Sequence, residues 1–245
     1  MKNPHYFMTP PIGRISAWMS ALLLSACASA PPPDWQANAF EALNAYASAY
    51  LDGNVGEKRS DSGRVADAEW ARAKTALAST GRPDLMARAE LRRCAVHTAS
   101  LAFEPCTGYL TMAADAMPAD RTYAAFIRGD WVGLNKEHLP QHYRALLDAT
   151  TIPTDTNRLS SIADPLARLI AAAVLLQKKQ ITPIERAVAV DTASAQGWRR
   201  PLLGWLLVQR QQAEQTGDAG TSASLQRRID LVMQTRAEGL KTTPD

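Results

Sequence analysis

The chain has 245 residues, 46% of them hydrophobic, with 27 Lys and Arg against 24 Asp and Glu. The basic doublets, such as Arg92-Arg93 and Arg199-Arg200, are scattered instead of forming one stripe, so we expect no nucleic-acid partner. Strong helix formers dominate and runs of β-branched residues are few, so the composition predicts an all-α fold.

Residues 1–26 have the features of a bacterial signal peptide. Lys2 and Arg14 make the start of the chain weakly basic, and Ile15–Leu24 is an apolar run interrupted only by two serines. This run is too short to cross a bilayer, which takes about 20 residues, but it has the length typical of a secretory signal. Without residues 1–26 the chain has a formal net charge of only +1.

The segment Leu24-Ser25-Ala26-Cys27 resembles a lipobox, the site at which bacterial lipoprotein signal peptidase cleaves. The resemblance implies that residues 1–26 are removed and that Cys27 carries the acyl chains that anchor the protein in a membrane. The next residue is Ala28 and not Asp, which in a Gram-negative bacterium favours the periplasmic face of the outer membrane. The alternatives are secretion after cleavage at Ala30 and a retained anchor.

Behind this segment, apolar residues recur with helical spacing. Residues 27–34 are expected to form an extended tether, because Pro31-Pro32-Pro33 favours polyproline geometry, and Asp34 fits an N-cap. An all-helical domain over 35–238 and a disordered tail over 239–245 are predicted. The expected helices are 35–52, about 64–80, 83–101, 106–117, 119–128, 137–149, 165–177, 183–196, 199–216 and 221–238.

Two helices have specific start signals. Asp164 fits an N-cap that is followed by Pro165 in the first turn. Thr182 and Glu185 are spaced as a capping box, with Pro183 at the first helical position.

Paired in order, the predicted helices give five antiparallel hairpins that start near residues 35, 83, 119, 160 and 200. A step of about 40 residues is typical of stacked helical-hairpin repeats. The expected architecture is therefore a short solenoid, and an irregular helical bundle is the alternative.

Residues 43–73 resemble a tetratricopeptide repeat (TPR). Small and large residues alternate as that family requires, although the loop between the two helices is longer than in the family. The matching residues are Leu43, Tyr46, Ala47 and Tyr50 in the first helix and Ala66, Trp70 and Ala73 in the second. The resemblance implies a TPR-like domain, whose concave face binds other proteins.

Cys94 and Cys106 remain as a pair if Cys27 is lipidated, and in an oxidising compartment such a pair predicts a disulfide. The bridge requires the helix over 83–101 to end near Ser100 and the chain to fold back, because the Cα atoms must come within about 7 Å. The alternative is two free, buried thiols. The helix itself is expected to place Leu91, Ala95, Thr98 and Leu101 on one face.

Few residues suggest a metal-binding or catalytic role. His138 and His142, beside Glu137, have metal-ligand spacing, but Pro140 lies between them and no third ligand is evident, so we interpret them as surface or capping residues. We therefore expect no metal and no cofactor.

Glu104 and Asp130 are the candidate acids of a peptidoglycan-cleaving enzyme. No nucleophile motif and no phosphate-binding loop are present in the sequence, so we expect a protein without enzymatic activity.

The tryptophans and tyrosines are predicted to pack between helices, with a minority available to line a peptide groove. They are Trp131, Trp198, Trp205, Tyr46, Tyr50, Tyr109, Tyr123 and Tyr143. The expected function is that of a membrane-anchored lipoprotein that binds an envelope protein as a scaffold or assembly factor, for example as a pilotin. The alternatives are a peptidoglycan-acting enzyme and a small-ligand-binding lipoprotein.

Overall fold

The chain folds into α-helices, as the composition predicts. The computed structural model describes residues 33–53, 61–148, 153 and 155–239, and these contain no strand. The α-helices are α1 (Asp34–Asp52), α2 (Asp61–Ala78), α3 (Pro83–Ala99), α4 (Thr107–Leu110), α5 (Pro118–Ile127), α6 (Gln141–Arg144), α7 (Pro165–Gln177), α8 (Pro183–Ala195), α9 (Arg199–Gln215) and α10 (Ala219–Gly239). Short 3-10 helices span Lys136–His138, Ala145–Leu147 and Arg158–Ser161. The all-α prediction is confirmed.

The start signals act as the sequence predicts. The Asp164 side chain accepts a hydrogen bond from the Ala167 amide at the start of α7. Thr182 and Glu185 form both hydrogen bonds of the capping box of α8. The prediction for Asp34 is wrong, since this residue is already helical and Pro33 occupies the N-cap.

Two predicted helices are interrupted. The segment 137–149 consists of short helical pieces, because a residue before proline is forced towards extended geometry, and Leu139 has φ −81° and ψ 151° before Pro140. The segment 106–117 is helical only over α4 and continues as turns. Gly108 and the neighbouring threonines favour helix weakly, so the alanine spacing that suggested a longer helix does not suffice.

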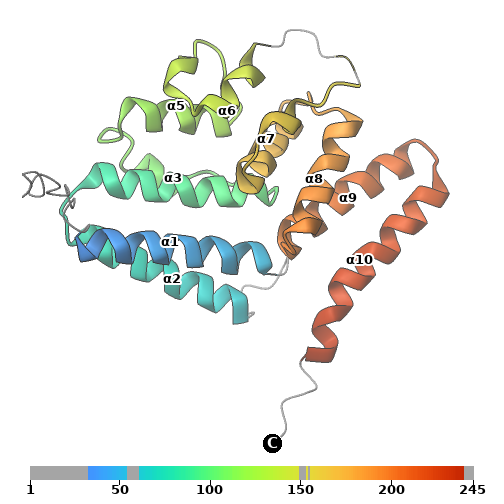
Figure 1. The fold of residues 1–245 in the computed structure, drawn as a ribbon, viewed down its shortest axis with the longest axis horizontal. Helices are drawn as coiled ribbons and strands as arrows, with labels where there is room; N and C mark the ends of the chain where they lie inside the picture. The colour runs from blue at the N-terminus through green and yellow to red at the C-terminus, as the bar shows by residue number, and fades with distance from the viewer. Residues whose placement is uncertain (1–32, 54–60, 149–152, 154, 240–245) are drawn as a thin grey trace, which may run out of the picture. The chain divides into compact units, whose positions relative to one another are not determined.

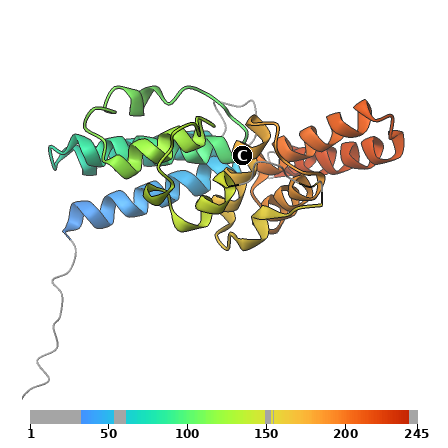
Figure 2. The same ribbon diagram turned by 90° about the horizontal axis from the view of Figure 1, so that it is seen from above.

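The helices pair as hairpins at both ends of the domain (Figures 1 and 2). α1 packs on α2, and α9 packs on α10 at the opposite end. In the middle, α3 packs against α7, and α1 also touches α9. A stack in which each repeat touches only its neighbours lacks such long-range contacts. The arrangement therefore combines the predicted hairpins with contacts expected of the alternative, an irregular bundle.

Two hydrophobic clusters form the core. The smaller one joins α1, α2 and α3 and contains the residues that carry the TPR resemblance: Ala73 is fully buried, and the rings of Tyr46 and Trp70 lie 5.8 Å apart. The larger one contains residues of every α-helix from α3 through α10. Leu166 and Trp198 pack against both clusters, so the core is continuous.

A buried ion pair fixes the segment before α7 to the start of α8. The Glu185 carboxylate is fully buried and accepts hydrogen bonds from Arg158 Nε at 2.8 Å and from the Thr182 amide at 3.0 Å. Burial alone would raise the pKa of Glu185, but these hydrogen bonds outweigh it and lower the pKa.

We expect Glu185→Ala to lower the free energy of unfolding by about 3–5 kcal/mol, because it leaves the Arg158 guanidinium buried without a counter-charge. Chemical denaturation at pH 7 measures the loss. Since the folded pKa is lowered, the contribution of Glu185 is present above the ordinary carboxylate pKa and is lost as pH falls through the folded value. Glu214→Ala, in the more exposed pair with Arg210, is the control, and an equally small loss in both variants would contradict the expectation.

Candidate functional site

Helix α3 has functional groups on two opposite faces. Each set has the spacing i, i+3, i+4, i+7, and the two sets are offset by two residues, which is a rotation of about 200° around the helix. One set is Glu90, Arg93, Cys94 and His97; the other is Arg88, Leu91, Arg92 and Ala95. The sequence predicted a single buried face.

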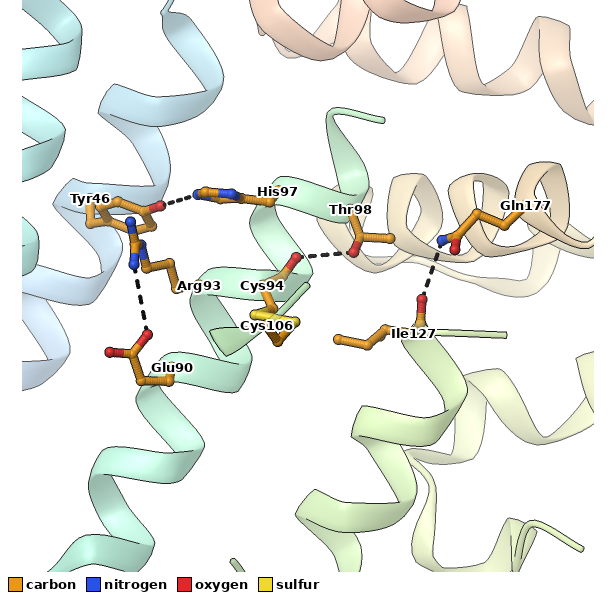
Figure 3. Close-up of a disulfide and its surroundings, with 9 residues drawn as sticks. All are labelled: Tyr46, Glu90, Arg93, Cys94, His97, Thr98, Cys106, Ile127 and Gln177. Carbon is orange, nitrogen blue, oxygen red and sulfur yellow. Dashed lines mark hydrogen bonds and ion pairs between the residues drawn. A yellow bond between two sulfur atoms is a disulfide. The ribbon is translucent and has the colours of Figure 1, made fainter. Parts of the chain in front are cut away.

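The first face lines a small polar pocket, which we define by Glu90, Arg93, Cys94, His97, Glu104, Pro105, Cys106, Thr107 and Gly108. Cys94 and Cys106 are joined by a disulfide with a Cα–Cα distance of 5.8 Å (Figure 3). The bridge ties the chain after α3 back onto that helix.

The fold-back that the bridge requires takes place at Leu101. α3 ends at Ala99, and Leu101 has a φ of +61°, a conformation unusual for a branched side chain. Its side chain lies against Gly204 of α9, where an added Cβ would meet Leu101 Cδ1 at 3.3 Å. Tertiary packing therefore holds the turn that brings Cys106 to Cys94.

His97 connects α3 to α1. Its Nε2 lies 2.7 Å from the Tyr46 hydroxyl (Figure 3). Its ring stacks on Tyr50 with centroids 4.3 Å apart. Burial, reinforced by the cations Arg93 and Arg200, lowers the pKa of His97 to about 4. Burial raises the pKa of Tyr46 to about 12. At neutral pH both groups are therefore uncharged, and the hydrogen bond joins a neutral phenol to a neutral imidazole.

Two carboxylates enter the polar pocket. Glu90 lies 3.8 Å from Arg93, and burial raises the pKa of its carboxyl group. Gly108 permits this position, because a Cβ there would come within 2.3 Å of Glu90 Oε2. Glu104 lines the same pocket. The pocket measures about 130 Å³, below the range of about 300–1,000 Å³ typical of small-molecule sites, so it accommodates a single polar group.

The second face of α3 lines a larger space, which we call the apolar cavity. It measures about 300 Å³ and lies between α3, α5, the segment 140–143 and α7. Its wall includes the apolar side chains of Leu91, Ala95, Leu166 and Ile170 and the ring of Tyr123.

The structure separates the two acids that the sequence suggested. Glu104 lies in the polar pocket, whereas Asp130 is exposed and pairs with Arg128 at 3.0 Å. The carboxylate beside Glu104 is instead Glu90, which the sequence reasoning missed.

The two histidines with the suggested metal-ligand spacing, His138 and His142, are exposed, and the neighbouring Glu137 pairs with Arg144. His142 contacts the Tyr143 ring at the rim of the apolar cavity. Within the described residues, no group of His, Cys, Asp and Glu has a metal-binding arrangement.

The aromatic residues pack between helices, as predicted. Trp205 is fully buried, Trp131 and Trp198 pack against the core, and Tyr143 stacks on Phe126 with centroids 4.7 Å apart. Tyr123 and Tyr143 also line the apolar cavity. The spacing along α3 was the signal that could have shown which of its functional groups share a face.

No protein-family model matches the chain, and searches of curated proteins and of solved structures found no match. None of the described helices is both long and apolar enough to cross a membrane. Cys27, the predicted signal peptide over 1–26 and most of the tether lie outside the described residues, as does the tail from residue 240.

We expect the Cys94Ala/Cys106Ala double variant to be less stable by about 2–3 kcal/mol, because the unfolded chain regains the freedom of a loop of 12 residues. Urea denaturation with and without a reducing agent measures the difference. The reductant should destabilise the parent protein and leave the double variant unchanged; a parent indifferent to reduction would refute the structural role of the bridge.

The lowered pKa of His97 predicts a pH-dependent stability. Between the ordinary pKa of 6.5 and about 4, the unfolded state binds a proton that the folded state excludes. The free energy of unfolding therefore decreases as the pH is lowered through this window. The full loss is about 3 kcal/mol at 1.36 kcal/mol per pKa unit. The free energy of unfolding, measured by denaturation from pH 7.5 to 4, should depend less on pH in His97→Gln than in the parent protein, whereas His138→Gln should follow the parent. The same pH dependence in all three proteins would argue against this assignment.

Proposed function

We propose that this protein is a lipid-anchored lipoprotein of the bacterial cell envelope whose TPR-like helical domain binds another protein as a scaffold or assembly factor. The lipobox-like sequence before Cys27 supports the anchor. The Cys94–Cys106 disulfide agrees with an oxidising compartment. Ala28 after the cysteine favours the outer membrane, with the helical domain on the periplasmic side.

The observation that carries protein binding is the set of exposed apolar side chains on the α9–α10 hairpin. α10 makes its contacts chiefly with α9, and the two helices form one end of the domain (Figure 1). Leu231 and Met233, on opposite sides of α10, are 64% and 61% exposed, and Leu207 on α9 is also exposed. Large apolar side chains left exposed in this way are candidate contact sites for a partner.

Site-specific photocrosslinking in cells tests the partner surface. A photoreactive residue at position 231, or on the opposite side of α10 at position 233, should capture one defined envelope protein from at least one of the two sides. The same residue at the exposed position 67 of α2 is the control. Recovery of no adduct, or of the same adducts from all three positions, would contradict the scaffold proposal.

The anchor has its own test. Cys27→Ala should move the protein from the membrane fraction to the soluble or uncleaved precursor fraction, because the thiol that accepts the lipid is gone. Ala28→Asp, which keeps the thiol, should leave the protein on a membrane but shift it to the inner membrane of a Gram-negative host. Membrane association of a Cys27→Ala chain that has lost residues 1–26 would refute lipidation at this residue.

A second candidate function rests on Glu90 and Glu104. Two carboxylates in one pocket, one of them with a pKa raised by burial, resemble the acid pair of glycoside hydrolysis. Release of muropeptides from purified peptidoglycan by the parent protein, with loss in Glu90→Gln and Glu104→Gln, would favour this enzyme over the scaffold.

A further inference from the structure

The apolar cavity and the charges at its mouth suggest a ligand site on elements other than the α9–α10 surface. The wall is formed by aliphatic side chains of α3 and α7 and by two tyrosines. Tyr123 and Tyr143 stack with centroids 5.9 Å apart, and neither hydroxyl group is a buried polar atom without a hydrogen-bond partner. The interior therefore requires no polar group from an occupant.

Three of the four charged groups at the mouth are already engaged. Arg88 forms a two-pronged ion pair with Asp120, with N–O distances of 3.1 Å. Asp164 accepts the backbone hydrogen bond that caps α7. The neighbouring His142 has a pKa lowered by burial, so it is neutral at pH 7.

Arg92 is the remaining charge. It lies one helical turn after Arg88 and donates a hydrogen bond to the neutral side chain of Asn44 on α1. In the part of the chain that the structure describes, no carboxylate pairs with it, and burial lowers its pKa. A partly buried guanidinium without a counter-charge is costly, and an anion placed beside it would be bound with charge-assisted hydrogen bonds.

The cavity volume limits the size of the occupant. About 300 Å³ lies at the lower end of small-molecule sites, which range from about 300 to 1,000 Å³. A single medium-length alkyl chain fits this volume better than a lipid with two chains. The chemistry required is therefore one apolar chain that ends in an anion.

We propose that the apolar cavity between α3, α5 and α7 binds a single-chain carboxylate of the medium-chain fatty-acid type, with its carboxylate on Arg92 and its chain between Leu91 and Ile170. This site goes beyond the proposed scaffold function and does not depend on it. It places a small amphiphile at the junction of the two hydrophobic clusters.

Isothermal titration calorimetry tests the site with residues 33–245, which form one compact unit. Dodecanoate should bind with 1:1 stoichiometry, and dodecanol, which lacks the charge, should bind about tenfold more weakly. Arg92→Gln should weaken dodecanoate about tenfold and leave dodecanol unchanged. Arg199→Gln, a change of the same kind at an exposed arginine of α9, should affect neither ligand.

A pair of cavity variants separates this site from non-specific adsorption. Ala167→Phe fills the cavity and should abolish the binding of both ligands. Ile170→Ala enlarges it and should shift the preferred chain from dodecanoate to tetradecanoate; this variant decides the matter if Ala167→Phe does not fold by circular dichroism. A tripeptide that ends in leucine, with a free or an amidated carboxyl group, tests a polypeptide C-terminus as the occupant.

Four outcomes would overturn the proposal. They are no binding of dodecanoate at millimolar concentration, equal binding by Arg92→Gln, a chain-length preference that ignores Ile170→Ala, and binding of the free-carboxyl peptide without binding of dodecanoate. Failure to capture a partner at α10 would contradict only the scaffold function and would not affect the proposed ligand site.

Discussion

The burial of α3 from opposite sides is the constraint on which the rest of the domain depends. Val96 belongs to the cluster with α1 and α2, and Leu91 belongs to the cluster with α5 and α7. A helix with one apolar stripe packs against one layer, whereas α3 has to be covered on both sides. The chain before α3 and the chain after it are therefore organised around the same helix.

This position explains why polar groups accumulate along α3. Burying a charged or polar side chain is tolerated only with partners, and most of those on α3 have them: Arg88 has Asp120, Glu90 has Arg93, and His97 has Tyr46. The disulfide adds a covalent tie from the same helix to the segment before α4. Arg92, whose hydrogen bond goes only to a neutral amide, stands out against this pattern.

Much of the fold could be predicted from local sequence signals. Helical periodicity, the capping box at Thr182 and the cap at Asp164 act within a few residues, so the helix positions follow from the sequence. The interruption before Pro140 was present in the sequence but was outweighed by the apolar spacing around it. The bridge between Cys94 and Cys106 needed the turn at Leu101, which packing against α9 supports.

The parts that could not be predicted arise from contacts between distant segments. Arg200 donates to the Tyr50 carbonyl at 2.7 Å across 150 residues, and no periodicity encodes that pairing. The polar pocket and the apolar cavity likewise depend on which helices meet on each side of α3. The spacing along α3 indicates which side chains share a face, but the partners opposite that face are set by tertiary packing.

Hydrogen exchange measured residue by residue on the native protein tests the central position of α3 most directly. Backbone amides in the middle of α3, around Leu91 to Val96, should exchange only through global unfolding and be the slowest in the chain, because both clusters must open to expose them. Amides of α10, which packs chiefly on α9, should exchange much faster. Exchange of α3 at the rate of α10 would contradict the account.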